Sequence, residues 1–225
     1  MRHLLRRSDI ALFAAVLCVV NVPLLVSGAP ALQLVYSPAA VGNGEWWRLL
    51  THPFVHVSRY HLLLDGVAFL ALLWGLADRR ASDRVALVTA SAAASLLAAA
   101  LVPGEVAKYG LCGLSGVGHG LMAGTAVLSL REDDAAGRRV GIVVLCVVAV
   151  KALAEAATGR LVLDLVHLGD LGRPNRLCHL GGVIGGALAA LAVGARAQPS
   201  PAADPSSRNS VARGDAAAQK PGMPS

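Results

Sequence analysis

Six apolar stretches, separated by more polar segments, constrain the fold of this chain more than any other feature. They cover residues 9–28, 59–77, 83–102, 113–130, 139–157 and 178–195. A transmembrane helix needs about 20 predominantly apolar residues, and helices buried in a soluble core are usually shorter. The chain is also 55% hydrophobic and only 15% charged, too few polar residues to cover a soluble domain of 225 residues. We therefore predict an all-α, polytopic membrane protein with six transmembrane helices.

The basic residues predict how these helices are oriented. If the N-terminus is cytoplasmic, ten arginines lie beside cytoplasmic helix ends and six basic residues lie on the opposite side. This excess agrees with the positive-inside rule, so we expect both termini in the cytoplasm. We expect residues 1–8 to form a cytoplasmic N-terminus and 9–195 the membrane domain. Residues 196–225 lack apolar periodicity and are expected to form a disordered cytoplasmic tail.

Two features of the sequence admit another interpretation. The net charge of +6 would suit nucleic acid, but the basic residues lie in short clusters and aromatic residues make up only 4%. We expect a lipid bilayer and no nucleic-acid partner. The first stretch looks like a secretory signal, with arginines before it and Ser27-Gly28-Ala29 at its end. Its apolar region is about 17 residues, long for a signal, so we interpret it as an uncleaved helix.

Small and polar residues interrupt the fourth stretch. Ser115 lies in Gly113-Leu114-Ser115-Gly116, close to the expected start of a helix. Unpaired backbone N–H groups and the positive end of the helix dipole gather there. A serine nucleophile at this position would have hydrogen-bond donors beside it for a developing oxyanion. Polar groups inside a membrane span are usually functional. To act as a nucleophile, Ser115 also needs a base, which another part of the chain must supply.

His179 is the best candidate for that base. It opens the sixth stretch on the side of the membrane where Ser115 opens the fourth. Gly116, Gly120 and Gly124 form one stripe on a helix, and the glycines after His179 include a second stripe, Gly182 and Gly186. Such stripes let helix axes approach closely. If they pack together, Ser115 and His179 come within hydrogen-bond reach.

A second polar group stands before and within the second stretch: His52, His56, His61 and Asp65. His61 and Asp65 share a helical face, as do Ser115 and His119. In one interpretation His61 donates to the oxyanion, and in the other His61, Asp65 and His119 are interior polar contacts. Zinc is a further alternative. Its ligands would come from His52, His56, His61, Cys112, Cys178 and His179, although the chain has no His-Glu-x-x-His.

The four cysteines of the chain fall into two kinds by their position. Cys18 and Cys146 fall inside apolar stretches and are expected to be small apolar fillers. Cys112 and Cys178 lie close to Ser115 and His179 in the sequence, on the non-cytoplasmic side, where an oxidising compartment permits a disulfide. The alternative is two unpaired cysteines at a close helix crossing.

Together these residues resemble the rhomboid family of intramembrane serine proteases. The resemblance covers residues 9–195 and rests on Trp47-Arg48, the histidine series ending at His61, the Gly113–Gly116 motif and His179. It implies a Ser–His dyad without a carboxylate or a cofactor, in which Ser115 is the nucleophile and His179 the general base. The Ser115 N–H and the His61 side chain would stabilise the oxyanion. The supporting residues would be Asp65, Gly113, Leu114, Gly116 and His119.

The sequence departs from the family at Asp65, where rhomboids usually have Asn. A carboxylate cannot donate a hydrogen bond to an oxyanion unless it is protonated. This departure puts one part of the family's oxyanion hole in doubt, and the alternative is that Asp65 holds the tautomer of a neighbouring histidine.

Within the family, the chain resembles the bacterial rhombosortase subgroup. The similar segments are Trp46–Thr51, Ser115–Gly120 and Lys151–Glu155. The resemblance implies a bacterial inner-membrane protein and membrane-anchored substrates that carry a C-terminal Gly-Gly sorting helix. We expect Lys151 and Glu155, four residues apart, to pair with each other. The competing function is a catalytically inactive rhomboid-like protein that binds membrane clients.

Overall fold

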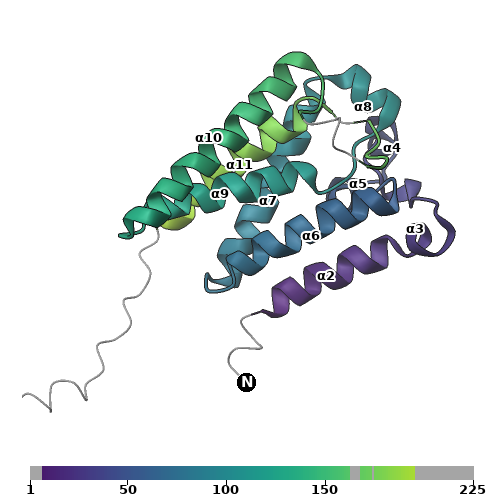
Figure 1. Cartoon of the computed structure of the whole chain (residues 1–225). Helices are drawn as coiled ribbons and strands as arrows, with labels where there is room; N and C mark the ends of the chain where they lie inside the picture. Colours follow the sequence, from purple (N-terminus) through teal and green to yellow (C-terminus); the bar gives the residue numbers. More distant parts are fainter. Residues whose placement is uncertain (1–6, 163–167, 174, 196–225) are drawn as a thin grey trace, which may run out of the picture. The chain divides into compact units, whose positions relative to one another are not determined.

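The computed structural model describes residues 7–162, 168–173 and 175–195 (Figure 1). The elements in chain order are α2 (Ser8–Val20), α3 (Val22–Ser27), η1 (Leu32–Leu34), α4 (Pro38–Gly42), α5 (Arg48–Thr51), η2 (His52–Phe54), α6 (Arg59–Gly75), α7 (Ala81–Ala100), α8 (Pro103–Tyr109), α9 (Ser115–Ser129), α10 (Ala135–Thr158) and α11 (Cys178–Gly194). The described residues form no strand beyond an isolated bridge between Tyr36 and Leu111. The all-α prediction is confirmed, and the predicted tail at 196–225 lies outside the described residues.

Helices occupy all six predicted apolar stretches, and the first is broken in two. By length and hydropathy, α7 and α10 can each cross a membrane. The α5–η2 segment and α6 form a third candidate if the pair, bent by 94°, counts as one span. Since α9 has 15 residues and α11 has 17, the six-span count remains a prediction.

Local sequence explains where several helices begin and end. The Ser58 hydroxyl accepts the His61 N–H at the start of α6, and Asp134 accepts two N–H groups at the start of α10. Gly159, in a left-handed conformation with φ of 67°, ends α10. Buried Asn21 separates α2 from α3, and its side chain donates to the Phe54 carbonyl at 2.6 Å. This bond ties the first helix to the segment before α6.

Helix α11 packs between α9 and α7, and glycines face both neighbours. A Cβ at Gly182 would overlap the carbonyl oxygen of Gly116, and one at Gly186 would overlap that of Gly120. On the other face, Gly181 lies against the backbone of Ala94 in α7. The predicted pairing of glycine stripes is confirmed. Because only glycine allows this approach, the sequence fixes how closely the starts of α9 and α11 lie.

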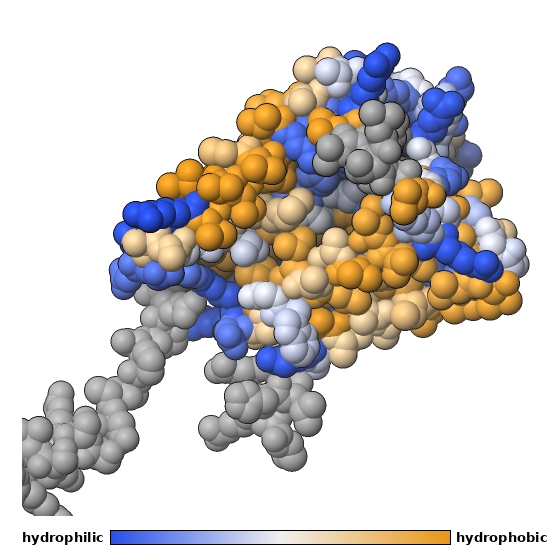
Figure 2. All heavy atoms as spheres, viewed as in Figure 1, coloured by the Kyte–Doolittle hydropathy of each residue, from blue (hydrophilic) through white to orange (hydrophobic). Residues whose placement is uncertain are grey.

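The remaining helices surround this centre. Helix α10 packs against α9, α6 packs against α9 on another side, and α2 packs against α6 (Figure 1). Figure 2 shows apolar side chains over the outer surface of α10 and along α2 and α6. Large exposed apolar residues there include Leu12, Val19, Leu63, Val67, Trp74, Val143, Val147 and Val150. An apolar outer surface of this kind suits contact with lipid.

Candidate active site

Ser115 is the first residue of α9. The loop before it turns at Gly113, whose φ of 100° is rarely adopted by other residues. Backbone hydrogen bonds hold the loop in place: Gly113 N–H donates to the His52 carbonyl at 3.2 Å, and Leu111 bridges to Tyr36. No side chain caps the start of α9. The first amide groups of the helix therefore remain available beside the Ser115 hydroxyl.

The His179 ring meets this hydroxyl. Nε2 of His179 lies 3.0 Å from Oγ of Ser115, within hydrogen-bond range. His179 is the second residue of α11 and is buried. The glycine contacts between α9 and α11 bring the two helix starts together. The predicted proximity of the two side chains is confirmed, and their catalytic roles remain predictions.

A carboxylate, which the predicted dyad does not include, also contacts this pair. Oε2 of Glu155 lies 2.6 Å from Nδ1 of His179. The expected pair with Lys151 also forms, because Nζ of Lys151 lies 2.7 Å from the other oxygen, Oε1. A carboxylate can accept from two partners at once, so the ion pair and the histidine contact coexist. Sequence spacing revealed only the partner on the same helix.

His119 joins the same group from the second turn of α9. Its ring stacks on that of His179, with centroids 4.0 Å apart and planes 10° apart. Nδ1 lies 2.7 Å from the carbonyl oxygen of Ser115, and Nε2 lies 2.9 Å from Nζ of Lys151. His119 is thus an interior polar contact, and it also lies directly against the candidate base.

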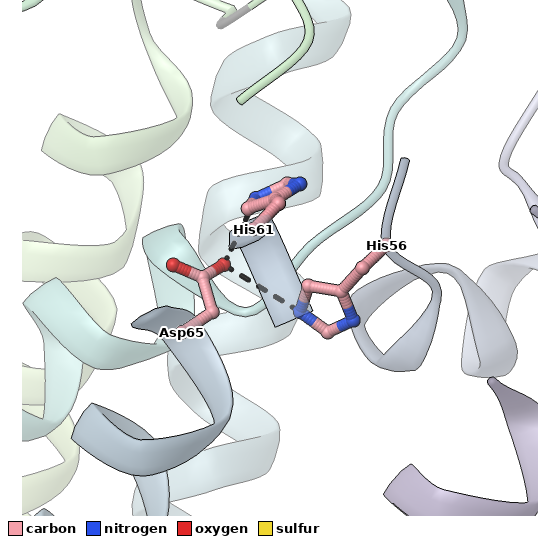
Figure 3. Close-up of side chains that lie close together, drawn as sticks. All are labelled: His56, His61 and Asp65. Carbon is pink, nitrogen blue, oxygen red and sulfur yellow. Dashed lines mark ion pairs between the residues drawn. The ribbon is translucent and has the colours of Figure 1, made fainter. Parts of the chain in front are cut away.

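Asp65 lies between two histidines (Figure 3). Figure 3 shows the rings of His56 and His61 directed at one carboxylate oxygen, Oδ2, at 3.6 Å and 3.1 Å from their Nε2 atoms. A Cβ added at Gly113 would meet the ring of His61, so His61 lies against the loop that precedes Ser115. Asp65 therefore lies against two histidines, and its role in holding a histidine tautomer stays a prediction.

The cluster around Glu155 and His179 and the cluster around Asp65 both border one cavity of about 400 Å³. Its lining includes Ser115 and His179 on one side and His61 and Asp65 on another. Leu64, Leu72 and Met122 contribute apolar surface to the wall. Cavities of this size with a few convergent polar groups are typical of ligand and substrate sites. The nucleophile and base candidates therefore face this cavity.

All four cysteines are unpaired in this structure, Cys112 and Cys178 included. The alternative of two free cysteines near the helix crossing is therefore the one observed. Burial raises the pKa of the Cys112 thiol to about 11, and the nearby charge of Asp65 acts in the same direction. Cys112 is consequently a poor nucleophile near neutral pH.

Comparison with known protein families agrees with this geometry. A family model described as Rhomboid domain matches residues 43–196. The chain belongs to the rhomboid family. No curated protein matches it. Rhomboids are generally serine proteases that act on membrane proteins in the bilayer, so this chain is an integral membrane protein of an intramembrane protease family.

Two groups of potential metal ligands come together in the described part of this rhomboid: His56, His61 and Asp65, and His119, Glu155 and His179. Of the candidate ligands for zinc, His56 and His61 meet in the first group together with Asp65, and His179 falls in the second. In the second group, both ring nitrogens of His179 already have partners in Ser115 and Glu155. That group is arranged as a chain of proton donors and acceptors.

The first loop of the rhomboid has a structural role that its sequence only partly reveals. The Arg48 guanidinium donates to the carbonyls of Leu32 and Val35 and pairs with Glu45 at 2.6 Å. The neighbouring Trp46 and Trp47 side chains are exposed. Arg48 thus holds the loop together, and the exposed indoles suit the lipid–water boundary.

Proposed function

We propose that this rhomboid is an intramembrane serine endopeptidase. Ser115 is the nucleophile and His179 the general base. The observation that carries the proposal is the 3.0 Å contact between Oγ and Nε2, made beside a cavity by two helix starts that glycine packing brings together. A hydroxyl needs an adjacent base to attack a peptide bond at neutral pH, and this contact supplies one.

In the proposed reaction, the proton of Ser115 Oγ passes to His179 Nε2 as Oγ bonds to the carbonyl carbon of the scissile peptide. The carbonyl oxygen takes the electron pair and becomes an oxyanion. The Ser115 N–H and the His61 side chain are proposed to donate to it. His179 then gives its proton to the leaving amine, and water releases the acyl group by the same steps.

The substrates proposed are membrane-anchored proteins, in particular those that carry a C-terminal Gly-Gly sorting helix, as in the rhombosortase subgroup. We also propose an inner-membrane location in a bacterium with six spans and both termini cytoplasmic. Residues 9–195 would form the protease domain, with 1–8 and 196–225 on the cytoplasmic side. The positive-inside pattern and the apolar outer surface support this topology.

Co-expression with Gly-Gly-tailed membrane proteins tests the proposal. S115A and H179A should each lower cleavage by several powers of ten, and the double variant should lose little more than either one. S129A, which changes another serine of α9, is the matched control and should cleave normally. Near-native cleavage by S115A would show that the mechanism is wrong. Failure of the wild type to react with a fluorophosphonate probe would favour the inactive, client-binding alternative.

A further inference from the structure

We propose that Glu155 is the third member of the catalytic group, a positioning residue that fixes the tautomer of His179 and stabilises its imidazolium form. The inference rests on the proposed roles of Ser115 and His179. It makes the site a Ser–His–Glu triad assembled from three helices, α9, α11 and α10.

The surroundings of Glu155 are those of an ionised carboxylate. The residue is 2% exposed, and three donors reach it. Oε1 accepts from Nζ of Lys151 at 2.7 Å and from the Val162 N–H at 2.9 Å, while Oε2 lies 2.6 Å from Nδ1 of His179. A buried charge is tolerated only when it is paired and hydrogen-bonded, and Glu155 meets both conditions.

The contact with Glu155 decides which nitrogen of His179 carries the proton. An ionised carboxylate only accepts hydrogen bonds, so Nδ1 of His179 must be the donor. In the neutral ring, Nε2 is then an acceptor, and it lies 3.0 Å from the Ser115 hydroxyl. The hydroxyl proton can pass to it directly. The opposite tautomer would place an N–H against Oγ and leave the serine without a base.

Lys151 and His119 hold the arrangement from the other side. The Lys151 ammonium is a donor only, so Nε2 of His119, at 2.9 Å, must accept from it. Nδ1 of His119 therefore carries the proton and donates to the Ser115 carbonyl at 2.7 Å. With both nitrogens occupied, the His119 ring cannot turn, and it stacks on the ring of His179 at 4.0 Å. Glu155 thus sets the tautomer of His179 and His119 supports its ring plane.

The proton balance of the step is simple. The Oγ–H bond of Ser115 breaks and its proton goes to Nε2 of His179, while the proton on Nδ1 stays where it is. Glu155 remains a carboxylate throughout and interacts with the imidazolium that forms. The ammonium of Lys151 balances the carboxylate charge in the resting site. No other reactant is needed.

A purely structural role for Glu155, as the partner of Lys151, makes different predictions. In E155Q the amide oxygen can accept from Lys151 and Val162, which turns the amide NH₂ toward Nδ1 of His179 and favours the wrong tautomer. We expect kcat for a cleaved Gly-Gly substrate to fall on the order of 10²–10⁴-fold with KM nearly unchanged. E132Q, an exposed carboxylate changed in the same way, is the matched control and should cleave normally.

E155Q leaves Lys151 without its charged partner, which could destabilise the fold. A second variant therefore separates a loss of catalysis from a loss of folding. Combining E155Q with K151M removes both charges at once, which avoids an unpaired buried charge. We expect the double variant to unfold near the wild-type temperature and still to show the low kcat. Wild-type kcat in that folded double variant would overturn the inference.

A spectroscopic measurement on the wild type tests the tautomer without any substitution. In protein labelled with ¹⁵N-histidine, the Nδ1–H tautomer of His179 is expected at neutral pH, and the Nε2–H tautomer would contradict the role of Glu155. The outcomes are separable from those for the proposed function. If S115A abolishes cleavage while E155Q retains wild-type kcat, only the triad fails; if S115A remains active, the serine protease mechanism fails.

Discussion

Two clusters in this molecule each bring one carboxylate together with two histidines, yet they differ in how completely they are bonded. Around Glu155, each carboxylate oxygen has a partner at 2.7 Å or closer. Around Asp65, the nearest histidine nitrogens lie at 3.1 Å and 3.6 Å from Oδ2. Buried Nε2 of His56, Nδ1 of His61 and Oδ2 of Asp65 have no hydrogen-bond partner among the described residues.

The Glu155 cluster is therefore preorganised, whereas the Asp65 cluster has hydrogen-bonding groups that are not used. Three helices supply the Glu155 cluster, and close packing fixes its rings and charges before any substrate arrives. The Asp65 cluster comes from α6 and the turn before it, and it borders the loop that leads to Ser115. A buried polar group without a partner is costly, so a cluster of them beside a cavity suits a site that exchanges partners during a reaction. Breaking each cluster separately therefore has different expected consequences.

Among the changes that set the two clusters apart, the largest effect is expected from G182V, which disturbs the helix packing behind the Glu155 cluster alone. Its Cβ would overlap the carbonyl oxygen of Gly116, so α9 and α11 must separate. Overpacking of this kind costs about 1–3 kcal/mol of folding free energy. Displacing Ser115 from His179 by even about 1 Å should lower kcat on the order of 10²-fold. Thermal unfolding in detergent and substrate cleavage measure the two effects.

G75A is the matched control for that experiment. A Cβ at Gly75 meets nothing within 4 Å, so alanine should be neutral or slightly stabilising there. If G182V unfolds at the same temperature as the wild type and cleaves normally, the glycine contact does not position the two helices as described.

A smaller effect is expected from D65N, which alters the Asp65 cluster. The change keeps the shape of the side chain but removes the charge that faces His56 and His61. We expect activity to fall about tenfold, less than the 10²–10³-fold typical of losing an oxyanion donor outright. The pH–rate profile should shift one limb, because a charge beside a titrating histidine is lost. Activity equal to or above wild type, with an unshifted profile, would mean that Asp65 merely stands where relatives have Asn.

The smallest effect concerns Cys112, whose thiol reports on the Asp65 cluster. Since burial and the charge of Asp65 raise its pKa to about 11, the thiolate is scarce at pH 8 and increases only as pH approaches that value. Alkylation of Cys112 should therefore accelerate with pH up to about 11 in the native protein. In D65N it should be faster at a fixed pH, by less than about tenfold, because burial is the larger cause.

Mass spectrometry of Cys112 peptides measures these rates. The same protein denatured in detergent provides the control, because burial and the fixed charge are then absent. Equal rates for native and denatured protein would contradict the raised pKa, and equal rates for native wild type and D65N would mean that Asp65 carries no charge at this site.

Much of the fold could be predicted because its determinants are local. Apolar stretches of the right length predicted where helices form, and spacing placed Gly182 and Gly186 on a single face. Asn21 could not be predicted in this way. A single polar residue in an apolar stretch looks incidental, and its importance comes from the Phe54 carbonyl, 33 residues away in the sequence.

The candidate site was predicted in part for the same reason. Ser115 and His179 stand at helix starts followed by glycines, so sequence alone indicated both residues. The Lys151–Glu155 pair was predicted from spacing along one helix. The contact between Glu155 and His179 was not predicted. It depends on the rotation of α10 about its own axis, which no short-range sequence pattern specifies.

The sequence by itself determined the helices, the glycine faces and the two residues proposed for catalysis, since each follows from composition, periodicity or a local motif, and its resemblance to known proteins determined the family. Only the tertiary structure decided which carboxylate contacts which histidine. Glu155 and Asp65 each lie four residues from a basic or titratable side chain on their own helix, and their sequences suggest equal roles. Packing of α10 against α9 and α11 brings a second helix to Glu155, while the two histidines that face Asp65 come from its own helix and the turn before it. Contacts across helices depend on rotation and depth, and these are properties of the assembled bundle.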